Sequence, residues 1–233
     1  AQQGTEKRQR CTLTFTTWAS SDISRESKTW DKPKALIRCD TASYISQGHA
    51  KNGGCVFQGI APSIVVGYGD GWDEQTNHLE TARNQPSQTI PRMPFKVIPG
   101  FDKNNMIERC ANNRVCGKNG LNRAWARRAC REEWGWAYSQ RYAPLPNGVS
   151  ENQLGLEWDG LPDHDGIQGD CDEFPFNATY NGSYQYKKGE KKFSVRVING
   201  QQNQDFGSAL NKWFNRERIL DHDKFFVRFK SAG

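Results

Sequence analysis

The residues best suited to chemistry lie close together in the segment 169–176. It carries three carboxylates, Asp170, Asp172 and Glu173, around a cysteine and before a proline. Pro175 disfavours helical backbone at the residue before it, so we expect a loop or the entry to a strand. In an extended chain, neighbouring side chains point to opposite faces. One carboxylate can then meet solvent or a metal ion while its neighbour is held by supporting partners.

A second interpretation of this segment requires no chemistry, because an acidic turn fixed by a disulfide through Cys171 has the same composition. The surrounding charges favour the chemical interpretation. Lysines follow the segment, and arginines precede it in a stretch, 121–142, that has the apolar spacing of a helix. These arginines form either a solvated helix face or a phosphate-binding surface. The flanking cations are Arg123, Arg127, Arg128, Arg131, Lys187, Lys188, Lys191 and Lys192.

The four histidines are less informative than the carboxylates. We expect His49 in a surface loop, His78 on a short helix as a packed or solvated residue rather than a base, and His222 in an exposed turn. His164 lies in an acidic, turn-rich run close to the carboxylates, and we consider it as an accessory acid or base. That run lacks the ligand spacing of a calcium loop.

Seven cysteines are present, and none has zinc-site spacing with another Cys or His. Disulfides in a secreted protein are therefore the leading account. The expected pairs are Cys39–Cys55, Cys110–Cys116 and Cys130–Cys171, with Cys11 unpaired. The third pair would clamp the arginine-bearing helix to the acidic segment. Two glycosylation sequons, at Asn177 and Asn181, agree with export.

The composition is that of a globular protein that favours acidic partners. The chain has 233 residues with 8 Trp, 12 Phe and 7 Tyr, which argues against disorder despite a mean hydropathy of −0.87. The formal net charge of +6 favours nucleic acid or another anionic partner. No apolar run reaches the length of a membrane helix, so we expect no membrane partner. We expect a monomer.

The pattern along the chain predicts an α+β fold, because segments with strand alternation and segments with helical spacing both occur. The expected strands are 11–18, 35–39, 55–60, 63–67, 193–198 and 225–229, and the expected helices are 72–84, 121–142 and 207–214. Four prolines between residues 85 and 105 mark an irregular connection. We therefore expect a β-rich part at 1–100 and a second domain at 101–233, or one continuous globular unit.

The acidic segment and the residues after it resemble the signature of the NucA/NucB deoxyribonucleases. The resemblance rests on residues 171–176, on Ala178 to Tyr180 with Gly182, and on a downstream block that contains Asn203, Gly207, Ser208, Trp213, Phe214 and residues 218–227. It is strong over about residues 125–228 and looser over 30–60. It implies a compact strand–strand–helix core like that of metal nucleases, stapled by disulfides, with the β-rich N-terminal part packed on it.

The resemblance also implies a secreted endonuclease that hydrolyses DNA with little sequence preference. Asp172 would be the general base that activates water, Glu173 a catalytic carboxylate that binds the metal or supports its ligands, and Asn203 a polar ligand or positioning residue near the metal. Asn181 and Asp170 complete the expected metal set. We expect one divalent cation, Mg²⁺ or Mn²⁺, with Ca²⁺ and Zn²⁺ as alternatives. DNA would bind mainly through its phosphates, and the candidate contacts are Arg127, Arg128, Arg131, Lys187, Lys188 and Arg196.

One residue departs from the family pattern. Asn181 stands where the family usually has Glu before Gly182, and it lies inside a sequon. An amide is a weaker oxygen ligand than a carboxylate, and a glycan there would crowd the site. The main alternative is therefore a catalytically weakened or inactive relative that binds nucleic acid or another polyanion. A ribonuclease and a disulfide-rich structural or carbohydrate-binding module are the further alternatives.

Overall fold

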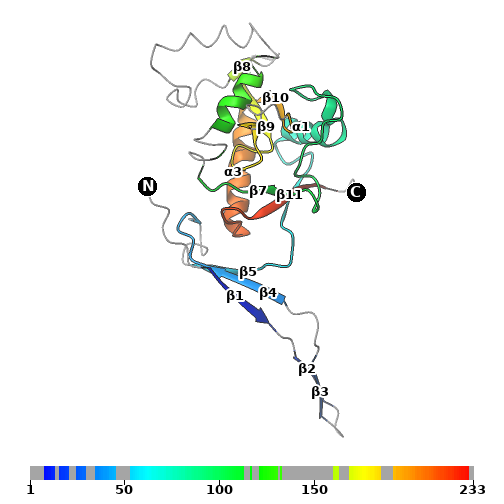
Figure 1. The fold of residues 1–233 in the computed structure, drawn as a ribbon, viewed down its shortest axis with the longest axis vertical. Helices are drawn as coiled ribbons and strands as arrows, with labels where there is room; N and C mark the ends of the chain where they lie inside the picture. Colours follow the sequence, from blue (N-terminus) through cyan, green and yellow to red (C-terminus); the bar gives the residue numbers. More distant parts are fainter. Residues whose placement is uncertain are drawn as a thin grey trace. The chain divides into compact units, whose positions relative to one another are not determined.

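The structure is a computed structural model (Figure 1). It describes residues 8–13, 16–20, 25–29, 35–45, 53–112, 116, 121–130, 132, 160–162, 168–184 and 191–230. The predictions made for the side chains of His49, Arg131, His164, Lys187 and Lys188 lie outside the described residues.

The chain divides into two compact units. The first comprises Ala1–Ala61 with Phe214–Arg218, and the second comprises Pro62–Trp213 with Ile219–Gly233. The boundary predicted near residue 100 does not coincide with this division. Strand pairing is the reason, because Ile64 pairs in register with Val227 and Ile90 forms a bridge to Val195. These contacts place the segment before residue 100 in the second unit.

The first unit is built from antiparallel strands. β4 (Ala35–Asp40) lies between β1 (Arg8–Leu13) and β5 (Gly54–Phe57), and β2 (Thr16–Ser20) pairs with β3 (Arg25–Thr29). The secondary-structure elements described in residues 1–61 of this unit are all strands.

Two further contacts hold the first unit together. The Cys39–Cys55 disulfide joins residues that face each other in the β4–β5 register. Asp40 is buried and accepts hydrogen bonds from the Arg218 guanidinium, through Nε at 3.1 Å and through Nη2. Paired charges of this kind are the usual way in which ionised groups are buried.

The second unit contains the acidic segment in a three-stranded sheet. β9 (Gln168–Phe174) is the central strand, antiparallel to β10 (Ser194–Asn199) and β8 (Gly160–Pro162). α3 (Gly200–Arg216), which belongs to this unit up to Trp213, follows β10 directly, and α1 (Asp73–Asn84) packs against β9 and β10. The order β9, β10, α3 is strand–strand–helix (Figure 1). The acidic segment is thus a strand in a sheet and not an isolated turn.

A second sheet of this unit brings distant parts of the chain together. β11 (Lys224–Phe229) pairs in parallel with β6 (Ser63–Val66) and antiparallel with β7 (Ile107–Glu108). A short 3₁₀ helix, η2 (Pro86–Gln88), follows α1, and residues 121–130 form the arginine-bearing helix.

Asn199 explains where α3 begins. Its side-chain oxygen accepts a hydrogen bond from the backbone N–H of Gln202 at 3.1 Å, which is an N-cap contact. The helix predicted from residue 207 therefore begins at Gly200 instead. As a result, Asn203 lies in the first turn of a helix.

Aromatic rings fill the core beside β9. Phe174 stacks on Phe101, with ring centroids 4.4 Å apart, and meets Phe176 edge-on at 5.0 Å. Phe176 in turn lies parallel to Phe225 at 6.4 Å. Phe174 and Phe225 are fully buried. The carboxyl end of β9 is therefore anchored in the core, two residues after Asp172.

The α+β class and the cysteine predictions are confirmed. The three disulfides are Cys39–Cys55, Cys110–Cys116 and Cys130–Cys171, and Cys11 is unpaired and exposed. Over the described ranges, no helix has both the length and the apolar character needed to cross a membrane.

Lys96 gives the second unit a pH-dependent stability. Its buried ammonium donates to Thr89 Oγ1 at 2.8 Å and to the Pro91 carbonyl at 2.9 Å. Burial and, to a smaller degree, the charge of Lys191 lower the pKa of Lys96 from 10.5 to about 7. Between these two values the unfolded chain binds a proton that the folded chain has lost. The free energy of unfolding therefore rises with pH across this window.

We expect the free energy of unfolding to increase by about 1–2 kcal/mol more in the wild type than in Lys96→Met between pH 7 and pH 8.5. Urea denaturation at both pH values measures the difference. An equal pH dependence in the two proteins contradicts the prediction.

Candidate active site

The two faces of β9 separate the carboxylates. Its unbroken register with β10 pairs Asp172 with Arg196 and Cys171 with Val197. Because side chains alternate along a strand, Asp170 and Asp172 share one face, and Cys171 and Glu173 share the other. The predicted separation of Asp172 from Glu173 follows directly from this geometry.

The face that carries Cys171 is structural. Cys171 is bonded to Cys130 on the helix at 121–130, and both sulfurs lie in an apolar cluster. The other members of that cluster are Ala126, Ala129, Phe193 and Val195. The predicted clamp between the arginine-bearing helix and the acidic segment is therefore present. It acts on the side of β9 opposite to Asp170 and Asp172.

Asp172 is held by a histidine from α1. His78 Nδ1 lies within hydrogen-bond distance of Asp172 Oδ2, and His78 Nε2 lies 2.7 Å from Ser194 Oγ. All three side chains are buried, with Ser194 0%, His78 1% and Asp172 5% exposed. His78 was predicted to be a packed or solvated helix residue, and the structure shows it packed. Its pairing with Asp172 was not predicted.

The Ser194–His78–Asp172 order resembles the hydrogen-bond chain of serine hydrolases, but it cannot act in that way here. A serine nucleophile must reach its substrate, and Ser194 has no exposed surface. Because His78 Nδ1 lies against the carboxylate, the arrangement fixes the orientation of Asp172. We therefore interpret His78 and Ser194 as positioning residues.

Asp170 and Asn203 form the second polar pair on this face. Asn203 Nδ2 donates to Asp170 Oδ2 at 3.3 Å, which joins the first turn of α3 to β9. Asp170 is 8% exposed. The structure thus brings together two of the four predicted metal ligands.

The other two predicted ligands lie elsewhere. Glu173 is on the opposite face of β9 from Asp170. Asn181 is bound to β7, because the backbone N–H of Glu108 donates to its Oδ1 at 2.8 Å. The predicted set of Asp170, Glu173, Asn181 and Asn203 is therefore not assembled around one point. The alternation of side chains along β9 turns Glu173 away from Asp170. The hydrogen bond from Glu108 holds Asn181 beside β7.

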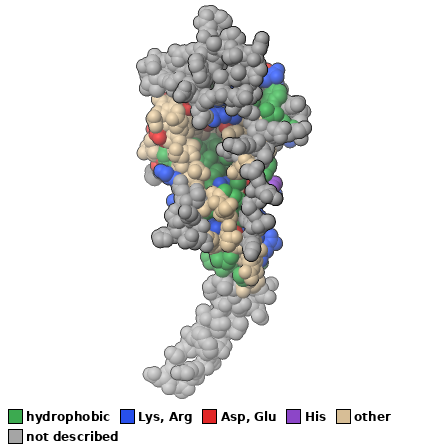
Figure 2. Space-filling view, turned by 90° about the vertical axis from the view of Figure 1, so that its left-hand side faces the viewer, with side chains coloured by type: hydrophobic (Ala, Val, Ile, Leu, Met, Phe, Trp, Pro, Cys, Tyr) green, Lys and Arg blue, Asp and Glu red, His purple; other side chains and the backbone are tan. Residues whose placement is uncertain are grey.

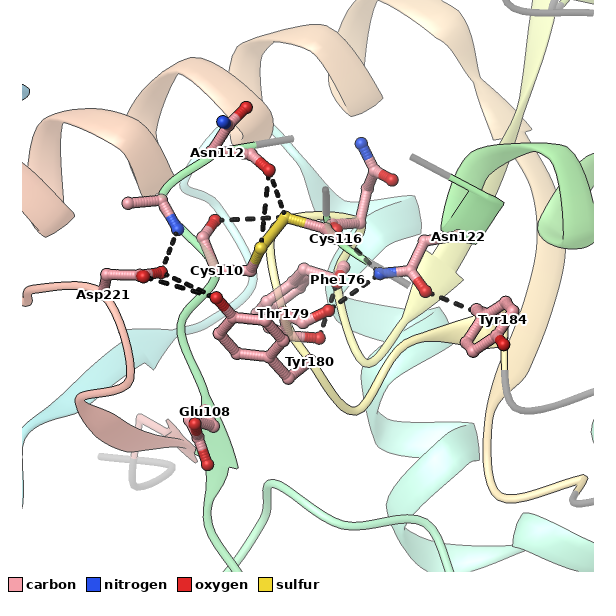
Figure 3. The surroundings of a disulfide bond; sticks show 12 residues. Glu108, Cys110, Asn112, Cys116, Asn122, Phe176, Thr179, Tyr180, Tyr184 and Asp221 are labelled. Carbon is pink, nitrogen blue, oxygen red and sulfur yellow. Dashed lines mark hydrogen bonds between the residues drawn. A yellow bond between two sulfur atoms is a disulfide. The ribbon is translucent and has the colours of Figure 1, made fainter. Parts of the chain in front are cut away.

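Asn122 organises the loop that carries Asn181. Its side-chain nitrogen donates to the carbonyls of Asn177 and Thr179, at 3.0 and 2.7 Å, and its oxygen accepts from the Tyr184 backbone (Figure 3). The Cys110–Cys116 disulfide lies beside the same loop (Figure 3). The sequon hydroxyls of Thr179 and Ser183 are fully buried in this loop.

Asn181 borders an exposed histidine. The ring of His222 stacks on Tyr180 with centroids 4.4 Å apart, and its Nδ1 contacts Glu108 Oε1. The side chain of His222 is 62% exposed, as predicted for a residue in an exposed turn. The residue that departs from the family pattern therefore supports this surface contact and not the Asp170–Asn203 pair.

The chemistry of the Asp170 face fits a hard divalent cation. Within the described parts of the chain, no three His, Cys, Asp or Glu side chains are arranged to hold a metal ion. Sites for Mg²⁺ often use only one or two carboxylates and leave other positions to water and substrate phosphate. Asp170, Asp172 and the amide of Asn203 are oxygen donors of that kind.

The predicted DNA contacts differ in exposure. Arg127 is buried, so it does not lie on a solvated helix face. Arg128 is exposed, pairs with Glu132 at 2.9 Å and lies over the ring of Trp125. Arg196 is exposed on the Asp172 face of β10 and contacts Asn77 of α1. On the face drawn in Figure 2, the described Lys and Arg side chains lie in small separate groups.

Fold and site define an α+β protein whose strand–strand–helix unit carries paired carboxylate and amide side chains. Residues 148–228, about a third of the chain, match the family model described as Deoxyribonuclease NucA/NucB. The resemblance seen in the sequence is thereby confirmed over that stretch, which contains β9, β10 and α3. α1, with His78, lies outside it. No curated protein and no solved structure matches the chain.

Proposed function

We propose that this protein is a secreted, metal-dependent endonuclease that hydrolyses DNA phosphodiester bonds with little sequence preference. The observation that carries the proposal is the position of the family match. It covers the strand–strand–helix unit on which Asp170, Asp172 and Asn203 lie on one side. The metal-nuclease character of this unit is part of the proposal.

Asp172 is the general base in this proposal. His78 holds Oδ2, so the other carboxylate oxygen accepts the proton of the attacking water. Asp170 and Asn203 hold the divalent cation, Mg²⁺ or Mn²⁺. When bound, such a cation neutralises charge on the phosphate and stabilises the leaving oxygen. Glu173 is left out of this ligand set, because it faces the other side of β9.

The exposed fractions of the side chains support Asp172 as the base and Asp170 as a ligand, with Ser194 only in a positioning role. Asp170 and Asp172 keep 8% and 5% of their surfaces exposed, whereas Ser194 keeps none. A water molecule and a phosphate oxygen therefore need to reach only the edges of two carboxylates. Arg196, exposed on the same face, is placed to attract the DNA backbone without reading bases.

Binding through phosphates predicts an affinity that falls steeply with salt and depends little on sequence. The positive net charge supports an anionic partner. Three disulfides support an oxidising compartment, and we assign the protein to the extracellular space. Asn177 and Asn181 are the proposed glycan acceptors.

The second candidate is a relative that binds polyanions without cutting them. Asn181 favours it, because the amide replaces the usual family carboxylate and is engaged by Glu108. Restoring a carboxylate with Asn181→Glu separates the two. If the wild type binds DNA but does not cut it, and Asn181→Glu cuts it, the inactive relative is correct.

The experiment that tests the proposal is nicking of supercoiled plasmid by the full chain. We expect cleavage with Mg²⁺ or Mn²⁺ and none with EDTA, and the same digestion of RNA measures the preference for DNA. Salt-dependent DNA binding without cleavage under any divalent metal contradicts the nuclease proposal and favours the polyanion-binding candidate.

A further inference from the structure

Gln75, on the inner face of α1, has a buried amide without a hydrogen-bond partner among the residues that the structure describes. The residue is fully buried, and neither its Nε2 nor its Oε1 has a hydrogen-bond partner among the described residues. Almost all buried side-chain amides in folded proteins are hydrogen-bonded, since an unpaired one opposes folding. Such an amide in a native structure requires an explanation, and the known ones are strain, a catalytic role, and a bound water or ion.

Three contacts enclose the place where Gln75 lies. α1 meets β9 through His78 and Asp172, α3 meets β9 through Asn203 and Asp170, and α1 meets α3 through Trp72 and Phe206, whose ring centroids are 5.9 Å apart. Gln75 lies one helical turn after Trp72 and one turn before His78, so it shares their side of α1. Its amide therefore lies between the contact of α1 with α3 and the contact of α1 with β9.

The contacts along β10 agree with this placement. Glu74 Oε2 accepts from the backbone of Asn199 at the end of β10, and His78 contacts Ser194 at its beginning. α1 thus runs antiparallel to β10, and Gln75 lies at the Asn199 end. Asp170 pairs with Ile198 at that same end. Gln75 is therefore level with Asp170 and not with Asp172.

We propose that Gln75 is a ligand of the divalent cation, with Oε1 binding the ion beside Asp170 and Asn203. This inference rests on the proposed function, which requires the cation. An amide oxygen is a hard donor, and one or two carboxylates with amide oxygens and water satisfy Mg²⁺ or Mn²⁺. The role accounts for the unpartnered amide oxygen, and Nε2 stays free to donate to a water or phosphate oxygen bound with the ion.

The ligand comes from outside the family match. α1 ends at Asn84, whereas the match begins at residue 148. The strand–strand–helix segment alone therefore has an incomplete site. Cation affinity depends on α1 being packed against β9 and α3.

Isothermal titration of the full chain with Mn²⁺ tests the proposal, together with melting temperatures in EDTA. Gln75→Leu is expected to weaken Mn²⁺ binding at least tenfold. Its melting temperature in EDTA should be equal to or higher than that of the wild type, because the substitution removes two unsatisfied atoms. Gln75→Glu should bind Mn²⁺ several-fold more tightly, because a carboxylate replaces the amide. Gln88→Leu, the same change at an exposed position of η2, should alter neither quantity.

Mn²⁺ affinity tests this inference, whereas plasmid cleavage tests the nuclease proposal, so the two can fail independently. Wild-type affinity for Mn²⁺ in Gln75→Leu overturns the inference, whether or not the protein cuts DNA. Absence of Mn²⁺ binding by the wild type overturns it as well. Tight binding that Gln75→Leu weakens, in a protein that cuts no plasmid, supports the inference and contradicts the nuclease function.

Discussion

Replacing Asp172 with Asn is expected to lower the rate of plasmid cleavage by about 10²- to 10⁴-fold, the usual contribution of a general base. The substitution keeps the shape of the side chain but removes its ability to take a proton from water. Initial rates of nicking under saturating Mg²⁺ measure the effect. DNA affinity should change little, because phosphate contacts and not Asp172 hold the backbone.

Asp205→Asn is the matched control for this variant. Asp205 is an exposed acid on α3 that contacts Gln201, so the same chemical change there should leave the cleavage rate within about twofold, as expected for surface substitutions. If Asp172→Asn cuts at the wild-type rate, another group accepts the proton and the assignment of the base is wrong. If both variants lose activity equally, the loss reflects net charge and not base catalysis.

The parts of the fold that depend on local pattern were predictable. Pro175 predicted a loop or the entry to a strand, and β9 is a strand up to Phe174. The Cys39–Cys55 pair was predicted because the two cysteines lie in two strand-like segments on either side of a Gly-rich polar loop. In the structure the two residues face each other. Such features depend on residues that are close together in the sequence, so one sequence is enough to predict them.

The partner of Asp172 could not be predicted in the same way. His78 and Asp172 are 94 residues apart, and their contact depends on α1 packing across β10. The sequence showed that His78 lies on a helix, but helical periodicity identifies only a buried face and not what that face meets. Gln75 and His78 lie on one face of this helix, and both are buried. Polar residues on a helix face that is expected to pack inward were the signal in the sequence that this face meets polar groups.

The structure brings only part of the predicted metal set together, for a related reason. The set was taken from residues in or near the blocks of the family resemblance, whereas side-chain direction decides which of them lie close together. Glu173 adjoins Asp172 but points the other way, and Asn203 is distant in sequence but bonded to Asp170. Asn199 decides the latter contact, because its N-cap starts α3 early enough to place Asn203 in the first turn.

His78→Asn is expected to lower the free energy of unfolding by about 2–5 kcal/mol, because each buried polar group that loses its hydrogen-bond partner costs about 1–3 kcal/mol. The shorter side chain cannot contact both Asp172 and Ser194, so a buried carboxylate and a buried hydroxyl lose their shared partner. Urea denaturation measures the change. His222→Asn is the matched control, because His222 is exposed and Asn tolerates its positive φ of 66°, and a change of about 0.5 kcal/mol is expected there.

Catalysis distinguishes a positioning role for His78 from a purely structural one. Under conditions where His78→Asn is fully folded, a positioning role predicts that kcat falls about 10- to 100-fold, as for other groups that orient a catalytic side chain. KM should change little, because the buried His78 side chain cannot reach the DNA. If folded His78→Asn retains wild-type kcat, His78 supports only the packing of α1 on β9. In that case the sheet alone orients Asp172. Its proposed role as the base then depends on its position on β9 and not on the contact with α1.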